Sequence, residues 1–339
     1  MRGTAFMYDK GLSVLERYGL SSQATYRGRG ALICETQEGL KQIKPFEGSV
    51  KRLERQNQLL EHLRDAGHER LDLVLRNEEG SLVTTDREGY TYLVKDWWDG
   101  RECDAKSADD VRKGMRQLAL LHRDMYLDRE TENEKEDQAE SLLEVYQKHN
   151  QGMKKIRSYV RGRRQKSDFE YLLLEHMGRY LEYGEQAFEH LETSGYEQMR
   201  QQFLEKGTVC HGEYNQHNIL IRGDATTVVN FDHFRFEDQT ADIAQFMRKI
   251  MEKHGWNRGL AEDMIESYSR VHPLSDEEWH CLAVRLSYPE KFWKIVCFYY
   301  NNNKAFLSAR HQEKLVNLLK QENAWQDFMK SLFHNFLFL

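Results

Sequence analysis

One short stretch of the chain carries residues whose types and order match phosphoryl-transfer chemistry. Residues 211–220 read HGEYNQHNIL, and residues 228–232 read VVNFD. In kinase-type sites, one carboxylate positions the attacking hydroxyl, while an amide five residues later and a carboxylate on the next strand hold magnesium against the nucleotide phosphates. Glu213, Asn218 and Asn230 stand at these three places. The spacing therefore predicts a kinase-type site in which charged positions have changed.

The changes weaken the two carboxylate functions in different ways. Glu213 keeps a carboxylate on a side chain one methylene longer, and a misplacement of ~1 Å can cost ~100-fold in rate. Asn230 replaces an anionic ligand with a neutral amide, although magnesium is usually held by one or two carboxylates plus phosphates. The candidate magnesium ligands are Asn218, Asn230 and Asp232. The changes favour a pseudoenzyme, and a slow kinase with Glu213 as base stays open.

This motif resembles that of the aminoglycoside phosphotransferase and choline kinase group. The loop of that group reads H-G-D-x-x-x-x-N, and its strand ends in an aliphatic residue, isoleucine and aspartate. Two further acids follow, which Asp238 and Asp242 match by their offsets of eight and twelve residues from Asn230. In this register Asp232 falls where the group has a glycine. The resemblance implies ATP and Mg²⁺ as the cofactors of an active member.

The phosphate-contacting lysine and its partner are less clearly marked. Lys44 is the best candidate for this lysine, and Lys41 is the competing one. Residues three apart on a strand face opposite ways, so the two lysines point to different sides of the sheet. In small-molecule kinases such a lysine pairs with a helix glutamate, and that place falls on Gln56. Glu54 lies ~200° away around the helix axis. The predicted nucleotide-binding set is Lys44, Gln56, Asn230 and Asp232.

These side chains need a sheet and a helix to position them. Residues 31–36 and 40–44 flank a Gln-Glu-Gly turn and predict a hairpin. Residues 49–66 predict a helix, and residues 70–76 and 90–97 are two more strand candidates. Two small strand pairs are expected within the motif region. Apolar residues at helical spacing predict helices at 107–126, 137–165, 168–205, 240–254, 259–270, 275–287 and 310–332.

The pattern as a whole predicts an α+β, bilobal, protein-kinase-like fold. A β-rich amino-terminal lobe with one helix would span residues 1–99, and a mostly helical lobe would span 100–339. The second lobe would contain the catalytic-loop remnant at 211–232 and a helical insert at 131–205.

Composition limits the classes of function. The 339 residues are 40% hydrophobic and 31% charged, as in ordinary soluble proteins, and no run of ~18 apolar residues predicts a membrane span. The first residues lack a long apolar stretch and a small-residue cleavage site, so we expect no secretory signal. Five cysteines without a C-x-x-C pair predict reduced thiols. A net charge of −6 argues against nucleic-acid binding.

A basic run within the predicted insert allows two interpretations. Residues 153–166 hold seven basic residues and no acid, and Lys154, Arg157, Arg161 and Arg164 fall on one face of the predicted helix. They could bind an acidic partner or a phosphorylated ligand. They could also form a solvated face balanced by the acidic run at 130–140.

Several longer stretches resemble one family over nearly the whole chain. They are KDWWDGREC at 95–103, LALLH at 118–122, VNFD at 229–232, Asp242 with FMRKIMEK at 246–253, and LSYPEK at 286–291. The chain resembles the CotS-type spore-coat family of endospore-forming Firmicutes, whose members are kinase-like. The resemblance implies synthesis in the mother-cell cytoplasm, deposition on the spore coat, and other coat proteins as partners. A coat scaffold, a small-molecule phosphotransferase and a nucleotide-sensing switch are the three hypotheses.

Overall fold

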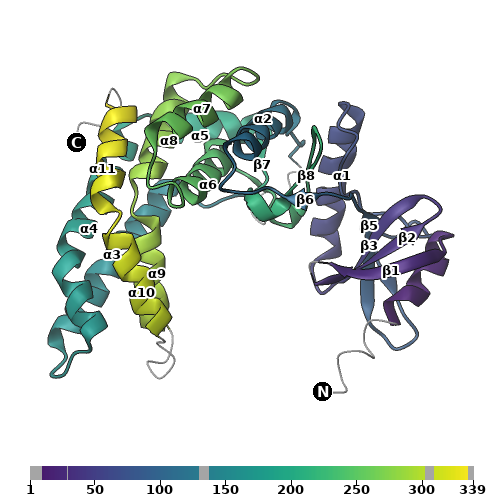
Figure 1. The fold of residues 1–339 in the computed structure, drawn as a ribbon, viewed down its shortest axis with the longest axis horizontal. Helices are drawn as coiled ribbons and strands as arrows, with labels where there is room; N and C mark the ends of the chain where they lie inside the picture. The colour runs from purple at the N-terminus through teal and green to yellow at the C-terminus, as the bar shows by residue number, and fades with distance from the viewer. Residues whose placement is uncertain (1–9, 29, 130–136, 302–308, 335–339) are drawn as a thin grey trace. The chain divides into compact units, whose positions relative to one another are not determined.

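The computed structural model describes residues 10–28, 30–129, 137–301 and 309–334 (Figure 1). Contacts between residues divide the chain into two compact units. The first unit comprises Met1–Asp137 and Gly207–Arg235, and the second comprises Gln138–Lys206 and Phe236–Leu339. The predicted lobe boundary between residues 99 and 100 stays a prediction.

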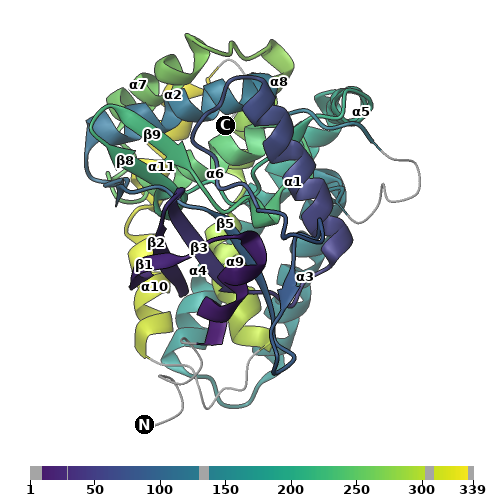
Figure 2. The same ribbon diagram turned by 90° about the vertical axis from the view of Figure 1, so that its right-hand side faces the viewer.

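A five-stranded antiparallel sheet opens the first unit, after the 3-10 helix η1 (Lys10–Tyr18). Its order is β1 (Ser22–Gly28), β2 (Ala31–Thr36), β3 (Gly39–Pro45), β5 (Thr91–Asp96) and β4 (Thr84–Thr85). The predicted hairpin is confirmed as β2 and β3, with Thr36 opposite Gly39. Strands β3 and β5 lie side by side in both ribbon views (Figures 1 and 2), which brings Lys44 and Lys95 onto neighbouring strands.

Helix α1 (Val50–Asp65) confirms the helix predicted in this unit. Its N-terminus is capped by Ser49, whose hydroxyl accepts the N–H of Arg52. Its leucines are buried as the periodicity requires, and Leu53 packs with Val74, Leu82 and Leu93. This apolar contact fixes the side of α1 that faces the sheet, and Gln56 is also buried.

The strand predicted at 70–76 is wrong. Only Val74 forms an isolated bridge, opposite Lys95 of β5. Leu75 donates to the Val94 carbonyl and Leu73 accepts from Asp96, each at 2.8 Å, so the Val74 N–H points away from β5 and donates to Asn57 Oδ1 of α1 at 3.0 Å. The pairing extends no further, since the Leu71 carbonyl accepts from Trp98 Nε1 and the Asn77 N–H donates to the Ser81 carbonyl in a turn.

The motif region of the first unit contains short strands and helical turns. A three-stranded sheet has the order β6 (Arg101–Glu102), β8 (Ile219–Arg222) and β9 (Ala225–Val228). The 3-10 helix η2 (Gln216–Asn218) precedes β8, and η3 (Phe231–His233) follows β9. Strands β7 (Val209–Cys210) and β10 (Arg235–Phe236) lie at the two ends, and α2 (Ala108–Asp124) precedes the region in sequence. The β8–β9 hairpin therefore separates Asn218 from Asn230.

The second unit is helical. Its helices are α3 (Leu142–Gly162), α4 (Asp168–Thr193), α5 (Tyr196–Glu205), α6 (Thr240–Met251), α7 (Arg258–Ser269), α8 (Asp276–Ser287), α9 (Glu290–Asn301), α10 (Ala309–Leu319) and α11 (Glu322–Leu332). The single helix predicted at 168–205 is wrong, because Gly195 adopts a left-handed conformation with φ of 75° between α4 and α5. The single helix predicted at 310–332 is also wrong. The break allows Trp325 and Phe328 of α11 to pack against Trp256.

A buried ion pair anchors the first of the two downstream acids. Arg285 of α8 donates to Asp238 Oδ2 at 2.6 Å and to Glu237 Oε1 at 2.8 Å. Burial of the nearby Cys281 thiol raises its pKa to about 12, which keeps it protonated. Asp242 is also fully buried, in the first turn of α6. Asp238 therefore serves packing within the second unit.

The predicted basic face is only partly helical. Helix α3 ends at Gly162, so placing Arg164 on the face of this helix is wrong. Lys154 pairs with Glu185 of α4 at 2.5 Å, and Arg163 pairs with Glu170 of α4. Residues 130–136 of the acidic run, which were expected to balance the basic face, lie outside the described residues.

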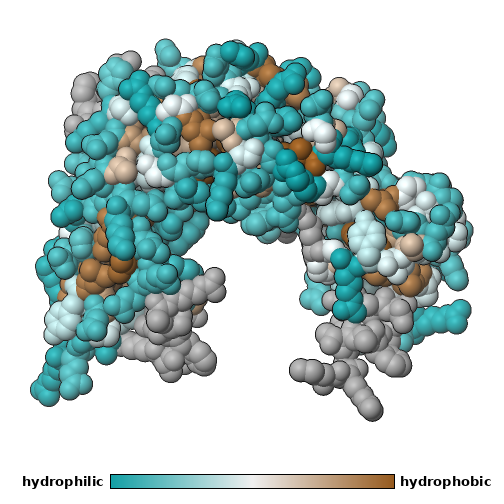
Figure 3. Space-filling view, in the orientation of Figure 1, coloured by the Kyte–Doolittle hydropathy of each residue, from teal (hydrophilic) through white to brown (hydrophobic). Residues whose placement is uncertain are grey.

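Most of the surface visible in the space-filling view is hydrophilic, and hydrophobic residues appear in separate patches (Figure 3). Among the described residues, no helix combines the length and apolar character that crossing a membrane requires.

Candidate functional site

The loop that begins the motif is held by its own backbone and by His211. The buried His211 donates from Nε2 to the Val229 carbonyl at 3.2 Å, and its Nδ1 accepts the Glu213 N–H at 3.2 Å. These two bonds fix the ring between the two halves of the motif. Gly212 has φ of 79°. A Cβ there would lie 2.0 Å from the His233 carbonyl oxygen, so only glycine fits this close approach.

We predict that Gly212→Ala destabilises the protein through this approach. It should lower the free energy of unfolding by about 1–3 kcal/mol more than Gly223→Ala does. Gly223 is the matched control, because its φ of 61° is also left-handed but an added Cβ there meets nothing within 4 Å. Urea denaturation of both variants measures the difference, and equal losses would contradict the close approach.

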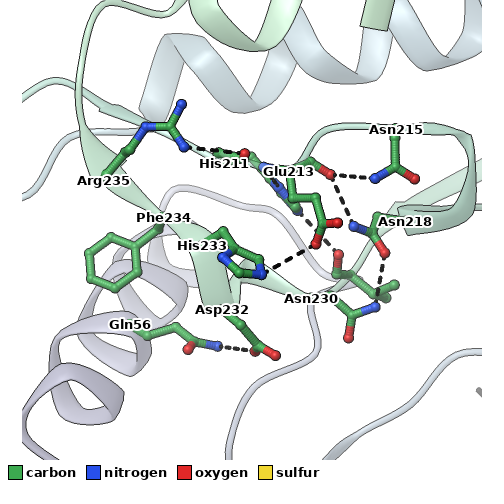
Figure 4. Close-up of polar contacts among 12 residues, drawn as sticks. Gln56, His211, Glu213, Asn215, Asn218, Asn230, Asp232, His233, Phe234 and Arg235 are labelled. Carbon is green, nitrogen blue, oxygen red and sulfur yellow. Dashed lines mark hydrogen bonds and ion pairs between the residues drawn. The ribbon is translucent and has the colours of Figure 1, made fainter. Parts of the chain in front are cut away.

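Glu213, the predicted catalytic carboxylate, lies in the loop between β7 and η2. Its backbone carbonyl accepts Nδ2 hydrogens from Asn215 and Asn218, each at 3.0 Å. Its carboxylate is 46% exposed and lies 3.5 Å from His233 Nε2 of η3 (Figure 4). The motif did not predict His233 at the site. The loop thus presents one accessible carboxylate with an imidazole beside it.

The two candidate amide ligands bind each other. Asn230 donates from Nδ2 to Asn218 Oδ1 at 3.0 Å (Figure 4). Asn230 has φ of 65° and ψ of 60°, a left-handed conformation that asparagine tolerates better than most residues. Its own N–H donates to Asp72 Oδ2 at 2.8 Å. The side chain therefore points at Asn218 from a backbone that Asp72 holds in place.

Sequence reasoning missed a buried ion pair behind Asn230. Lys95 Nζ lies 2.7 Å from Asp72 Oδ2 and donates to Asn230 Oδ1 at 3.3 Å. The two side chains are 1% and 0% exposed. Burial acts to lower the pKa of Lys95, but the attraction of Asp72, then of Asp232, outweighs it and leaves this pKa raised. A charged ammonium therefore faces the amide oxygen of Asn230, one of the predicted magnesium ligands.

This ammonium also settles which way the amide points. Lys95 has only hydrogen-bond donors, so it must face the oxygen of Asn230 and leave the NH₂ group for Asn218. A signal was available in the sequence. Lys95 directly follows the buried run YLV of β5, and a charge that continues such a run requires a buried partner.

Asp232 forms the third part of the site. Its Oδ2 accepts from Lys44 Nζ at 2.6 Å, and its Oδ1 accepts from Gln56 Nε2 at 3.4 Å (Figure 4 draws the second contact). Burial acts to raise the pKa of Asp232, but Lys95, then Lys44, lower it to about 2. The predicted residues Lys44, Gln56 and Asp232 thus form one hydrogen-bonded group.

The competing assignments take other partners. Lys41 faces away from Lys44 and pairs with Asp96 Oδ1 at 2.6 Å. Glu54 pairs with Arg76 at 2.7 Å on the exposed side of α1. Gln56, and not Glu54, is therefore the α1 residue at the site.

The residues at the predicted metal position do not fit a magnesium ion well. The oxygens of Asn218 and Asn230 already accept hydrogens from Asn230 and Lys95, and neither is anionic. The predicted carboxylate ligand, Asp232, is paired with Lys44, and Asp72, which accepts the Asn230 N–H, is paired with Lys95. Among the described residues, no group of three or more histidine, cysteine, aspartate or glutamate side chains could hold a metal. A divalent ion here would meet two neutral amides and two carboxylates that are each already paired with a lysine.

Comparisons of the sequence with known proteins agree on one family. Residues 12–332 match the family model described as "Spore coat putative kinase YutH". Spore coat protein S of Bacillus subtilis (strain 168) is 22% identical over 313 residues, which cover 90% of this chain and 87% of that protein. The endospore coat-associated protein YutH of the same organism is 26% identical over 170 residues, which cover 48% of this chain and 47% of that protein. The predicted CotS-type resemblance is confirmed.

Solved structures show the fold. An aminoglycoside phosphotransferase from Alicyclobacillus acidocaldarius subsp. acidocaldarius DSM 446 superposes with a TM-score of 0.83 at 17% identity, covering 96% of this chain and 95% of that one. Spectinomycin phosphotransferase APH(9)-Ia, solved with ADP and spectinomycin, gives a TM-score of 0.62 at 10% identity, with coverages of 97% and 98%. The predicted α+β kinase-like fold is therefore confirmed, and at these identities the likeness speaks for the fold alone.

Proposed function

The chain belongs to the spore-coat family whose model it matches, and we propose that it is a coat protein whose kinase-type site no longer transfers phosphate. In this proposal it is made in the mother-cell cytoplasm, is deposited on the spore and acts through contacts with other coat proteins. The observation that carries the proposal is Asn230. Its neutral amide, oriented by Lys95 and Asn218, stands where phosphotransferases carry a metal-binding carboxylate.

The physical reason is electrostatic. Phosphoryl transfer depends on metal ions that bridge the phosphates and neutralise the charge that develops on them. A carboxylate at residue 230 would supply one negative charge for that ion, and the amide supplies none. The nearby Lys95 ammonium, which Asp72 neutralises, already donates to the amide oxygen that a divalent ion would need. Loss of the metal ligand therefore removes the main source of transition-state stabilisation, even though Glu213 keeps a carboxylate.

One observation favours a second candidate, an ATP-dependent phosphotransferase for a small hydroxylated or amino-sugar acceptor. Glu213 is accessible and has His233 beside its carboxylate, which is an arrangement that could accept a proton from a hydroxyl. In this alternative Asn218 and Asp232 bind Mg²⁺ and Lys44 contacts the phosphates. Asp232 would have to leave Lys44 to do so.

Complementation in an endospore-forming host tests the proposal. We predict that a Glu213→Ala protein, fused to a fluorescent reporter, reaches the spore coat at a level within about twofold of the wild type, because a scaffold needs the fold and not the carboxylate. Glu54→Ala is the matched control, since it removes a glutamate whose ion pair with Arg76 lies away from the site. Loss of coat localisation in Glu213→Ala alone, with normal protein levels, would favour the phosphotransferase.

A further inference from the structure

Two lysines and two aspartates meet at the site of the first unit. Lys95 pairs with Asp72 at 2.7 Å, and Lys44 pairs with Asp232 at 2.6 Å. Asn230 lies beside the first pair, and Gln56 donates to the second. The four charges cancel, so the site is electrically balanced by its own side chains.

The two pairs differ in their ability to exchange partners. Lys95 and Asp72 are 1% and 0% exposed, so neither can reach a ligand in solution. Lys44 and Asp232 are 41% and 36% exposed. Only the second pair can open without uncovering a buried charge. Lys44 is thus the cation of the site with which an incoming anion can form an ion pair.

The Asp232 carboxylate accepts a hydrogen bond from Lys44, the cation predicted to contact the phosphates, at 2.6 Å. Phosphate and carboxylate oxygens both accept charge-assisted hydrogen bonds from an ammonium group at about 2.7–2.9 Å. Lys44 has three N–H donors and gives one to Asp232, so a phosphate chain at Lys44 would share the ammonium with this carboxylate and would be repelled by its negative charge. When Asp232 is displaced, Gln56 also loses its acceptor and its NH₂ group becomes available to the phosphate.

The fixed cation Lys95 has a further consequence. It supplies, without any ion from solution, a positive charge next to Asn230, where a kinase would hold a divalent metal. A phosphate chain that displaced Asp232 would meet the freed Lys44 ammonium beside the fixed Lys95–Asp72 pair. A divalent ion would find no carboxylate there whose charge is not already balanced by a lysine.

From these contacts we propose that the site binds the phosphate chain of a nucleoside triphosphate without a divalent metal, and that Asp232 is an internal competitor that limits this affinity. The inference rests on the proposed function, because it requires the metal position to be lost. It assigns Asp232 a role opposite to that of a metal ligand. As a competitor Asp232 weakens nucleotide binding, whereas as a metal ligand it would strengthen it.

The sign of one substitution decides between these roles. We expect Asp232→Asn to tighten ATP binding in the presence of EDTA by about threefold to tenfold, measured by calorimetry, because Lys44 loses its internal counter-ion. Asp232→Ala should change the affinity in the same direction, since it also removes the carboxylate. Lys44→Ala should abolish the binding of the wild type. Excess Mg²⁺ should leave the affinity of the wild type unchanged or lower it.

The opposite results overturn the proposal. Weaker or unchanged ATP binding by both Asp232 variants would do so, as would wild-type binding that requires Mg²⁺, or no binding to any variant at millimolar ATP. Asp96→Asn is the matched control, because it frees Lys41 on the other side of β3 and should not alter ATP binding. Thermal unfolding checks that each variant is folded.

Release of ADP with Mg²⁺ and candidate acceptors separately tests the proposed function. Turnover would overturn the loss of phosphotransfer, whereas metal-dependent binding without turnover would overturn only the role of Asp232.

Discussion

Lys95→Met should be the most destabilising single substitution at this site. It leaves Asp72 as a buried carboxylate without a counter-ion, and removal of one partner of a buried pair typically costs about 3–5 kcal/mol. The loss should extend beyond the pair itself, since Asp72 also holds the Asn230 N–H and Lys95 orients the Asn230 amide. Urea denaturation, monitored by circular dichroism, measures the change in the free energy of unfolding.

Two further variants make this result specific. Lys41→Met removes another largely buried lysine from the same sheet, but its partner Asp96 is 27% exposed and can be hydrated, so we expect a smaller loss. In the double variant Lys95→Met with Asp72→Asn, the neutral amide can still accept the Asn230 N–H, and part of the lost stability should return. If Lys95→Met cost no more than Lys41→Met, the buried pair would not be a main support of the site.

Asn230→Asp should convert the site to magnesium-dependent nucleotide binding. The substitution replaces the NH₂ group that donates to Asn218 Oδ1 at 3.0 Å with a carboxylate oxygen, so two acceptors would face each other. A cation between them relieves this repulsion, and the new negative charge supplies the anionic ligand that magnesium prefers. Aspartate also tolerates the left-handed backbone at this position.

We expect Mg²⁺ to tighten ATP binding to the Asn230→Asp protein by at least about tenfold, which is roughly 1.4 kcal/mol. Calorimetry with Mg²⁺ and with EDTA measures this ratio. Asn230→Ala is the matched control, because it removes the amide and adds no charge, so its affinity should not respond to Mg²⁺. A wild type that already shows the tenfold response would contradict the interpretation that the amide removed the metal site.

Much of the motif could be predicted from spacing alone. The step of five residues from Glu213 to Asn218 corresponds to one tight loop and the 3-10 turn η2, and a loop of this kind is local in the chain. The hairpin at Thr36 and Gly39 and the amphipathic helix α1 were predictable for the same reason. Each depends on turn chemistry or on a period of apolar residues within a short segment.

The errors have an equally local cause. The segment at 70–76 has the composition of a strand, yet its pairing with β5 is limited to one bridge, and the Leu71 carbonyl accepts from the Trp98 side chain instead of from a strand. The break between α4 and α5 depends on the left-handed backbone of Gly195, which the surrounding helical pattern obscured. A periodic pattern registers the apolar face of an element but not a single donor or dihedral angle that ends it.

The sequence by itself determined the family, the kinase-like fold and the neutral residue at 230, because these depend on residue types and on their order along the chain. The tertiary structure decided where the charges lie. Lys95 and Asp72 are separated by 22 intervening residues, and Lys44 and Asp232 by far more, so no spacing rule pairs them. Folding brings the side chains of β3, β5 and η3, with Asp72, within hydrogen-bonding distance of one another in these pairs. Because Lys95 and Asp72 are buried, they can pair only with each other. Lys44 and Asp232 are partly exposed and can exchange partners.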